Sequence, residues 1–346
     1  MIKLQMQRKT VLLLFGGESS EHEVSISSAR NVYAAIDDTK FEVIICFIDK
    51  AGKWWLLDEL GMTISTHDAP QIVPVLGSSC FVTIPASRMI QPDVILPILH
   101  GKNGEDGSVQ GLAQLLHIPI VGCDMTSAAI CMDKIATKQI LQANDITVVD
   151  YVVHHQQEDI PDFGNLTLKL GNPLFVKPAR AGSSVGVSKV STRDELHQAL
   201  DDAHTHDAMV LIERGVTARE IEVAVLGNPP LHKASLPGEI VPDGEFYSYD
   251  SKYSNASGSR VIIPAEIDEI LKERIHELSI RIYATLGCKG LARVDFFLLE
   301  DGTIYLNEVN TMPGFTNISM YPKLWRESGI SYSTLIEDLI NIALDT

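Results

Sequence analysis

The sequence predicts an α/β protein of two or three domains, and three features of the chain indicate this class. The chain has 346 residues, which exceeds the size of one ordinary hydrophobic core. Its first third alternates β-rich runs with segments of helical spacing, as expected for an open parallel sheet. Near its end, two alternating apolar runs flank Asp301-Gly302, which is the strongest short-range signal for a β-hairpin.

Composition excludes several classes of function. A net charge of −17 argues against nucleic-acid binding through a broad basic surface, although a local cationic pocket can still bind phosphates. The five cysteines form no CxxC pair, so we expect reduced, mostly buried thiols and neither a disulfide framework nor a zinc ribbon. We find no signal peptide and no apolar run near the roughly 20 residues of a membrane span. We therefore expect a cytoplasmic protein that does not insert into membranes.

The first third of the chain places two glycine-rich turns at the ends of predicted strands. The strands are expected at 11–15, 41–49 and 93–100; GGESSEHEVS follows the first, and HGKNGEDGS begins where the third ends. Ligands of open α/β sheets bind at the carboxyl ends of strands. The first turn lacks GxGxxG spacing, so a dinucleotide-binding fold has little support.

Residues in these turns are candidates for ligand contacts. Glu23 is explained more simply as a favourable charge at a helix start. Glu21 is open to the same explanation, or it could bind an ammonium group. His100 could be an internally bonded loop histidine or could contact an anion. Spacing alone leaves both alternatives open.

The middle of the chain predicts a phosphate-binding loop. A helix is expected over 132–146, with Asp133 as its cap. The segment 173–190 predicts a strand ending at Lys177, a loop rich in glycine and serine, and a second strand. The GxxxxGK[ST] order of a Walker loop is absent, so the lysine must come from elsewhere, and Lys134 and Lys177 are the candidates.

Two further strands carry acidic residues near this loop. They are predicted at 209–215, with Glu213, and at 218–227, with Glu220. Each glutamate taken alone would be an ordinary surface charge. Because lysines and glutamates gather around one glycine-rich loop, the sequence predicts nucleotide binding.

The predicted hairpin at 291–314 has the pattern of a metal site. If its Asp-Gly pair centres the turn, Asp295 faces Glu308 and Arg293 faces Asn310, all on one side of the ribbon. Opposed carboxylates with Cβ atoms roughly 5 Å apart repel each other unless a proton or cation lies between them. Asn310 adds a neutral oxygen, and Arg293 adds a positive charge of the kind used in phosphoryl transfer. A magnesium site is therefore favoured over a solvated acidic hairpin.

Seven sequence motifs occur in order along the chain, and the match they carry spans about residues 10 to 345. They are FGGESSEHEVS, HGKNGEDG, MDK, VKPARAGSSVGVSKV, FYSYDSKY, ARVDFF and NEVNTMPGFTNISMYP. In order and spacing they resemble the D-alanine:D-alanine ligases of the ATP-grasp superfamily. The resemblance implies an N-terminal α/β domain over 1–124 with the first D-alanine site. It also implies central and C-terminal domains over 125–214 and 215–346 that hold ATP between antiparallel sheets, with a lid at about 237–260.

The resemblance also implies the roles of most candidate residues. Those at the phosphates of ATP would be Lys134, Lys177, Ser183 and Ser184. Those near the adenine and ribose would be Glu213, Val216 and Glu220. The ligands of two Mg²⁺ or Mn²⁺ ions would be Asp295, Glu308 and Asn310. The stretch 213–216 lacks an aromatic residue that some members place near adenine, so the adenine contacts stay open.

The implied substrates are ATP and two molecules of D-alanine. Glu21 would bind the ammonium group of the first D-alanine, with His100 near its carboxylate. Ser319 and Met320 would receive the carboxylate of the second. The resemblance also implies a homodimer formed through the N-terminal domain and a role in peptidoglycan precursor synthesis.

The implied reaction has two steps. The first D-alanine carboxylate would attack the γ-phosphate of ATP, and the second D-alanine would attack the resulting acyl phosphate. Arg293 and the backbone of Gly314 would stabilise the oxyanion. In the lid, Tyr253 would hydrogen-bond towards Ser183 and Glu21, unless it is only an aromatic anchor.

Three alternative functions are weighed against this one. Phenylalanine in place of Tyr253 would have indicated a D-alanine:D-lactate ligase. Another ATP-grasp carboxylate–amine ligase should lack EHEVS and the lid pattern, and an inactive nucleotide-binding regulator should have lost the metal set or Arg293. Lys252 could assist the second substrate or close on phosphate.

Overall fold

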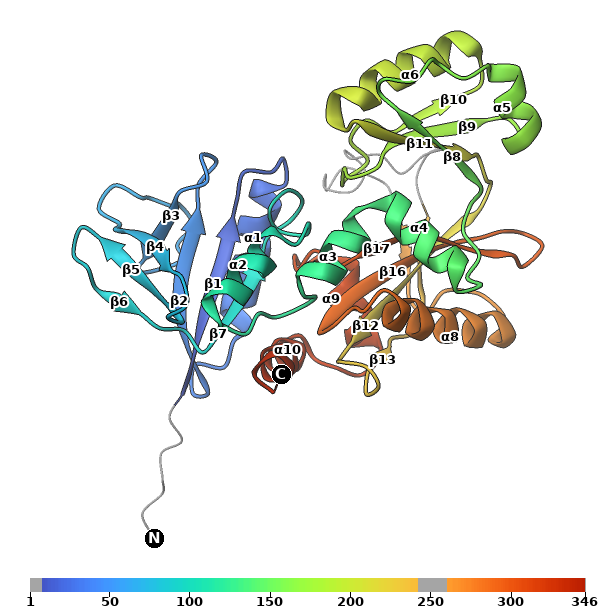
Figure 1. The fold of residues 1–346 in the computed structure, drawn as a ribbon. Coiled ribbons are helices and arrows are strands. Elements are labelled where there is room, and N and C mark those ends of the chain that lie inside the picture. Colours follow the sequence, from blue (N-terminus) through green and yellow to red (C-terminus); the bar gives the residue numbers. More distant parts are fainter. Residues whose placement is uncertain (1–7, 242–259, 346) are drawn as a thin grey trace.

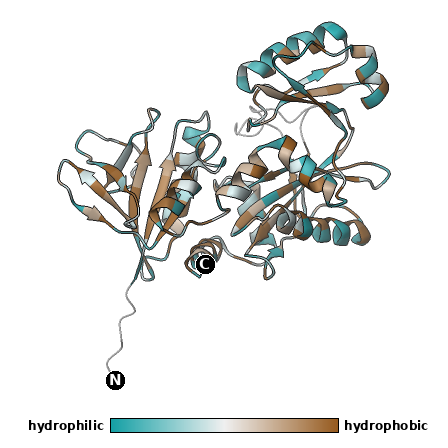
Figure 2. Ribbon diagram, in the orientation of Figure 1, coloured by the Kyte–Doolittle hydropathy of each residue, from teal (hydrophilic) through white to brown (hydrophobic). Residues whose placement is uncertain are grey.

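The computed structural model describes residues 8–241 and 260–345, which form three β-sheets with helices around them (Figure 1). The strands are mostly hydrophobic, and the outward faces of the helices are mostly hydrophilic (Figure 2). Among these residues, no helix combines the length and apolar character needed to cross a bilayer. The predicted mixed α/β class is confirmed.

The N-terminal sheet has the order β6-β5-β4-β3-β2-β1-β7. Its parallel part matches the three predicted strands and consists of β1 (Lys9–Gly16), β2 (Phe41–Ile48) and β7 (Val94–Ile98). The remaining strands pair antiparallel and are β3 (Trp54–Leu57), β4 (Gln71–Val75), β5 (Cys80–Ile84) and β6 (Met89–Ile90). The sheet is therefore mixed, which differs from the expected open parallel sheet. Short connections explain the difference, because they can join antiparallel strands but not parallel ones.

The two glycine-rich turns lie side by side at the carboxyl ends of β1 and β7. β1 and β7 are parallel neighbours, with Phe15 opposite Ile98 at their carboxyl ends. The first turn leads into α1 (His22–Ala35), and the second leads into α2 (Ser108–Leu116). Glu21 and His100 are therefore brought to the same side of the domain.

The central part consists of an antiparallel sheet and its helices. Asp133 caps α4 (Lys134–Ala143) by accepting from the backbone N–H groups of Ile135 and Ala136, as predicted, and α3 (Met125–Met132) precedes it. The sheet has the order β10-β9-β11-β8. Its strands are β8 (Tyr151–His155), β9 (Leu174–Pro178), β10 (Ser188–Val190) and β11 (Met209–Arg214). Helices α5 (Phe163–Leu170) and α6 (Arg193–His206) share one hydrophobic cluster with the sheet, and α6 lies above the strands in Figure 1.

The C-terminal sheet is also antiparallel, with the order β15-β14-β12-β16-β17 and β13 paired to β12. Its strands are β12 (Arg219–Leu226), β13 (Lys233–Ala234), β14 (Gly238–Val241), β15 (Arg260–Ile262), β16 (Leu291–Leu298) and β17 (Ile304–Asn310). The helices of this part are α8 (Glu269–Thr285), α9 (Met320–Glu327) and α10 (Tyr332–Leu344).

The hairpin of β16 and β17 has the predicted register at the site but not at the turn. Asp295 lies opposite Glu308 and Arg293 opposite Asn310, which confirms the predicted pairs. The expected two-residue turn is wrong, because Leu299 donates its N–H to the carbonyl of Thr303, which leaves a three-residue loop. A bulge between Asp295 and Phe296 then restores the predicted register. Gly302 supplies the left-handed residue of this loop, with φ +81°.

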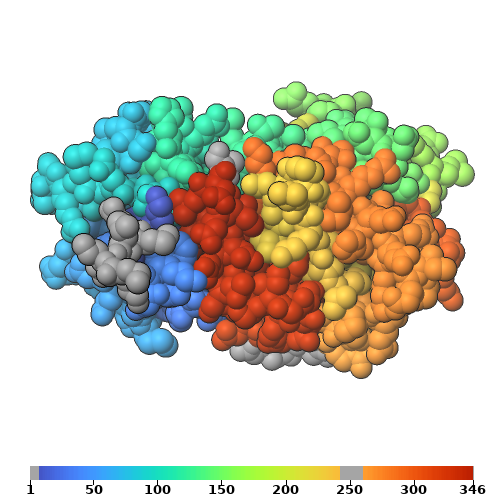
Figure 3. Space-filling view, turned by 90° about the horizontal axis from the view of Figure 1, so that it is seen from below, coloured from blue at the N-terminus to red at the C-terminus, as the bar shows by residue number. Residues whose placement is uncertain are grey.

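One hydrophobic cluster joins the two ends of the chain. It contains buried Leu13 of β1, Leu226 of β12 and Leu339 of α10, among others. Figure 3 shows the C-terminal residues between the N-terminal domain and the C-terminal sheet. The N-terminal and C-terminal parts of the chain are therefore packed against each other through this cluster.

Candidate active site

A cleft of about 150 Å³ brings together residues from all three parts of the chain. Of the residues predicted for the site, those lining it are Glu21, His100, Ser183, Arg293, Glu308, Asn310, Gly314, Ser319 and Met320. The carboxyl edge of the N-terminal sheet, the serine loop and the C-terminal hairpin therefore meet at one place.

Arg293 lies at the centre of a network of carboxylates. Its Nε and Nη2 atoms donate to the two oxygens of Asp295 at 2.8 and 2.7 Å, and Nε lies 3.0 Å from Oε2 of Glu222. Burial by itself would lower the pKa of Arg293, but Asp295 and Glu222 outweigh it and raise this pKa well above its usual value. The guanidinium is therefore permanently charged and held in one orientation.

The sequence reasoning missed Glu222. This residue lies on β12 directly opposite Asp295, so Glu222, Asp295 and Glu308 form a row across three adjacent strands. The available signal was that Glu220 and Glu222 are two residues apart on a predicted strand, which puts both side chains on the same face. What could not be read from the chain is that β12 pairs with β16.

The hairpin residues fit a hard divalent cation by donor type. Asp295, Glu308 and Asn310 offer carboxylate and amide oxygens, which Mg²⁺ prefers. In the structure the Nδ2 atom of Asn310 donates to Oδ2 of Asp295 at 2.8 Å. Among residues 8–241 and 260–345, no group of three His, Cys, Asp or Glu side chains is arranged to hold a metal ion. Asp295, Glu308 and Asn310 would together supply the oxygen donors for a cation, with the amide of Asn310 adding to the two carboxylates.

A second acidic group lies where β1 and β7 end. Glu105, which the sequence reasoning also missed, lines the cleft beside Glu21 and accepts from the N–H of Gly101 at 2.8 Å. Burial and then the charge of Glu21 raise the pKa of Glu105 well above its ordinary value. This side of the cleft is suited to a cationic group such as an ammonium.

His100 is bonded within the protein. Its Nδ1 atom lies 3.0 Å from the carbonyl oxygen of Met312, and Nε2 lies 3.4 Å from Oγ of Ser28. Burial lowers the pKa of His100, although the charge of Glu21 opposes this. A neutral imidazole with both nitrogens engaged therefore connects the end of β7 to α1 through Ser28 and to the C-terminal part of the chain through Met312. The predicted contact with a carboxylate would require one of these bonds to be exchanged.

Ser319 and Met320 lie at the start of α9. Ser319 is the N-cap residue, and its side chain makes no capping bond to the helix. Its Oγ instead accepts from the N–H of Thr316 at 2.9 Å. A Cβ added at Gly314 would lie 2.7 Å from this Oγ, so a larger residue there would require the Ser319 side chain to move. The free N–H groups of the first helical turn can receive a carboxylate.

The serine loop is strained. Ser183 and Ser184 both have left-handed backbone conformations, with φ of 52° and 59°. Such non-glycine residues cost about 1–3 kcal/mol each and persist only when their surroundings impose them. Lys134 contacts this loop by donating from Nζ to the carbonyl of Ala181 at 2.7 Å. The predicted contact of Lys134 with phosphate would replace this bond.

A larger pocket of about 570 Å³ lies between the central and C-terminal sheets. The predicted residues that line it are Lys177, Glu213, Val216 and Glu220. Residues 242–259, which include the predicted lid residues Lys252 and Tyr253, lie outside the described part of the chain. The volume is in the range of ordinary ligand sites.

Glu213 is engaged by two lysines. Its carboxylate oxygens lie 2.7 Å from Nζ of Lys177 and 2.9 Å from Nζ of Lys138. Burial would raise the pKa of Glu213, but Lys177 and Lys138 lower it to about 2. The carboxylate, which is only 4% exposed, therefore orients Lys177 in the structure. Lys138 was missed, although it lies one helical turn after Lys134.

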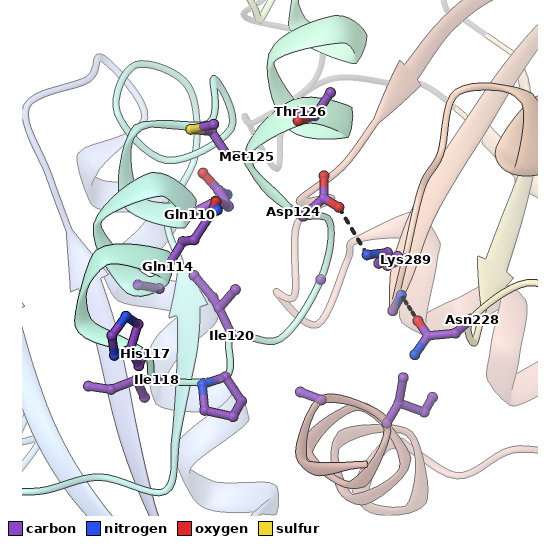
Figure 4. Close-up of a pocket in the computed structure, with 16 residues that line it drawn as sticks. Gln110, Gln114, His117, Ile118, Ile120, Asp124, Met125, Thr126, Asn228 and Lys289 are labelled. Carbon is purple, nitrogen blue, oxygen red and sulfur yellow. Dashed lines mark hydrogen bonds and ion pairs between the residues drawn. The ribbon is translucent and has the colours of Figure 1, made fainter. Parts of the chain in front are cut away.

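A separate cavity of about 540 Å³ lies between α2 and the C-terminal part (Figure 4). Gln110, Gln114 and His117 lie on one side of it, and the Asp124–Lys289 ion pair of 3.0 Å lies on the other. None of the predicted site residues lines this cavity. It is therefore distinct from the candidate active site.

Comparisons with known proteins agree over nearly the whole chain. Family models described as D-ala D-ala ligase N-terminus and D-ala D-ala ligase C-terminus match residues 10–123 and 140–341. The D-alanine--D-alanine ligase A of Salmonella typhimurium is 43% identical, covering 98% of this chain and 97% of the relative. The D-alanine--D-alanine ligase of Shouchella clausii is 44% identical, covering 98% and 96%.

Solved structures show the same likeness. The D-alanine-D-alanine ligase from Coxiella burnetii has a TM-score of 0.87 at 35% identity, covering 98% of this chain and 94% of the other. The VanG D-Ala:D-Ser ligase from Enterococcus faecalis has a TM-score of 0.89 at 36% identity, covering 97% and 100%.

The Glu213 network predicts different effects for its two sides. Glu213→Gln leaves the buried Lys138 and the partly buried Lys177 facing each other without a counter-charge, and we expect the free energy of unfolding to fall by about 3–5 kcal/mol. Lys138→Met removes a cation whose pKa is already lowered by burial, and Glu213 still has Lys177 as its partner. We therefore expect a smaller decrease in the free energy of unfolding for this variant. Thermal and urea unfolding would measure both. An equal loss in the two variants would contradict this account.

The same network predicts an acid dependence. The pKa of Glu213 falls from 4.5 to about 2 on folding. The stabilisation that the ionised carboxylate adds to the free energy of unfolding is therefore complete above about pH 4.5 and is lost as the pH falls towards 2. The difference in unfolding free energy between the wild type and Glu213→Gln should shrink over this interval. A constant difference from pH 7 to pH 2 would show that the carboxylate charge is not responsible.

Proposed function

The chain belongs to the D-alanine–D-alanine ligase family, and on this basis we propose that it joins two D-alanine molecules with cleavage of ATP to ADP and phosphate. The observation that carries the proposal is identity above 40% to ligases over nearly the full chain. The cleft supports it, because it combines an acidic side, a fixed arginine and a serine-rich loop.

The proposal includes a division of labour among three units, residues 1–124, 125–214 and 215–346. Each unit contains one of the three sheets, which supports the division. Glu21 of the first unit would bind the ammonium group of the first D-alanine. The acidic surroundings of Glu21 and Glu105 support this role, because they favour a cation.

In the first step, a carboxylate oxygen of D-alanine would attack the γ-phosphorus of ATP, and the bond to the β,γ-bridging oxygen would break to release ADP. The two reactants are both anionic, so their approach requires positive charge. Lys134, Lys177 and Arg293 would supply it, with the Ser183-Ser184 loop over the phosphates. Glu213, Val216 and Glu220 would lie around the adenosine, where they line the larger pocket.

In the second step, the amine of the second D-alanine would attack the carbonyl carbon of the acyl phosphate, and phosphate would leave with the C–O electron pair. Arg293 and the N–H of Gly314 would stabilise the oxyanion. Ser319 and the N–H of Met320 would hold the second carboxylate at the start of α9. This helix start supports the assignment, because it attracts anions.

Asp295, Glu308 and Asn310 would hold Mg²⁺ or Mn²⁺. When bound, the divalent ions would neutralise phosphate charge. Glu222, 3.0 Å from Nε of Arg293, would keep the guanidinium in place.

A homodimer formed through the N-terminal domain is also part of the proposal. Its support is a group of exposed apolar side chains on β4 to β6 and the following turns, namely Val73, Val75, Leu76, Ile84 and Met89. We further propose a cytoplasmic location and a role in peptidoglycan precursor synthesis. The five free, buried cysteines support a reducing compartment.

Incubation with ATP, Mg²⁺ and D-alanine should release phosphate and yield D-alanyl-D-alanine, identified by mass. L-alanine should give neither product. A second candidate is the use of D-serine as second substrate, which the similarity to the VanG D-Ala:D-Ser ligase favours. If D-alanyl-D-serine predominates when both amino acids are supplied, the second-substrate assignment is wrong.

Tyr253→Phe should raise the share of D-alanyl-D-lactate ester over dipeptide when D-alanine and D-lactate compete. The expected cause is loss of the hydroxyl that would tie the lid towards Ser183 and Glu21. Product ratios by mass measure the effect. An unchanged ratio would show that this hydroxyl does not select the second substrate.

Glu222→Gln should lower kcat about tenfold with little change in KM, because Arg293 loses a charged partner that supports it. Glu269→Gln is the matched control, since this glutamate forms only an exposed ion pair with Lys272 on α8. Equal kcat values in the two variants would exclude a role for Glu222.

Light scattering should give twice the monomer mass for the wild type and the monomer mass for Met89→Glu. Leu231→Glu, at an 88% exposed apolar residue elsewhere, is the control and should remain dimeric. A monomeric wild type would refute the dimer.

A further inference from the structure

We propose that Asp207 is a positioning residue for ATP, which fixes the phosphate loop, residues 179–187, through its ion pair with Arg180. The inference rests on the proposed function, because this loop is the part of the site assigned to the phosphates.

Asp207 is bonded entirely to the start of this loop and to its neighbouring strand. Its carboxylate accepts from the backbone N–H of Arg180 at 2.9 Å, from Nε at 2.9 Å and from Nη2 at 2.7 Å. It also accepts from the N–H of Met209 at 3.0 Å. Bonds to both the main chain and the side chain of one residue fix position and direction together.

The location of Asp207 is unfavourable for a charged carboxylate unless nearby donors compensate the charge. It is the C-cap residue of α6, where the helix dipole disfavours negative charge. Its side chain is only 3% exposed. Burial would raise the pKa of Asp207, but Arg180 and the N–H of Met209 outweigh burial and lower it. The four donors therefore stabilise a charge that neither the helix end nor burial favours.

The loop depends on a firm start because its middle is strained. Ser183 and Ser184, with positive φ, follow Arg180 by three and four residues. A strained conformation persists only when neighbouring contacts impose it. The anchor at Arg180 limits the alternative conformations that the loop can adopt.

Other contacts at the loop start would not all survive ATP binding. The N–H of Ala179 donates to the carbonyl of Met209 at 2.9 Å, and Lys134 donates from Nζ to Ala181 at 2.7 Å. The Lys134 bond would be given up if its ammonium moves to a phosphate. The Arg180–Asp207 pair is then the side-chain anchor, within the described part of the chain, that ATP does not compete for.

The test compares Asp207→Asn, Arg180→Met and the double variant. We expect each single change to raise KM for ATP and the Kd of ATP at least tenfold, with KM for D-alanine changed less than twofold. The double variant should bind ATP no more weakly than the more affected single variant, because both substitutions remove the same ion pair. Arg180 is half-exposed, so its variant should fold even if Asp207→Asn does not.

Asp162→Ala is the matched control. Asp162 caps α5 by accepting from the N–H of Asn165. Helix α5 packs in the same hydrophobic cluster of the central sheet as α6, the helix that ends at Asp207. It should lower the thermal stability without changing KM or Kd for ATP.

Two outcomes would overturn the inference. One is an ATP affinity within twofold of wild type in Arg180→Met; the other is an equal weakening by Asp162→Ala. Equilibrium binding of ATP is measured without D-alanine, so failure of the wild type to form dipeptide would refute the proposed function but leave this comparison valid.

Discussion

The arrangement of the site depends on the bidentate ion pair between Arg293 and Asp295. Both residues lie on one face of β16, and the strands on either side add Glu222 and Glu308 to the same face. One guanidinium is thus the positive centre of a row of carboxylates. Because the partly buried charges stabilise each other, removing one leaves the others insufficiently compensated. This pairing gives the hairpin a fixed positive charge beside oxygen donors for cations.

Charge divides the candidate site into two regions that suit different parts of the reactants. Glu21 and Glu105 make one side of the cleft acidic, which suits an ammonium group, and Arg293 lines the same cleft. The cations that suit phosphates lie outside this lining, because Lys134 contacts the serine loop and Lys177 lines the larger pocket. A chain with a net charge of −17 can therefore bind a polyanion, because the positive charge is local and held in place.

The sequence predicted local features better than those that depend on distant pairing. Alternation located the strands, and the residues of the metal pattern faced each other as expected, although the turn is longer and a bulge compensates for it. The antiparallel half of the N-terminal sheet was missed. So were Glu222, Lys138 and Asp207, because their partners are known only once strands or helices from other parts of the chain lie beside them. Glu213 lines the larger pocket, and the sequence did not indicate that Lys138 and Lys177 both engage its carboxylate.

The most direct test of the hairpin as a cation site is the binding of Mn²⁺ in the presence of a non-hydrolysable ATP analogue, followed by electron paramagnetic resonance. Asp295→Asn should weaken binding at least tenfold, because it removes a charged ligand. Asp301→Asn, at the exposed turn of the same hairpin, should leave binding unchanged. Equal Mn²⁺ affinity in Asp295→Asn and the wild type would contradict the central claim that this face of the hairpin holds the metal.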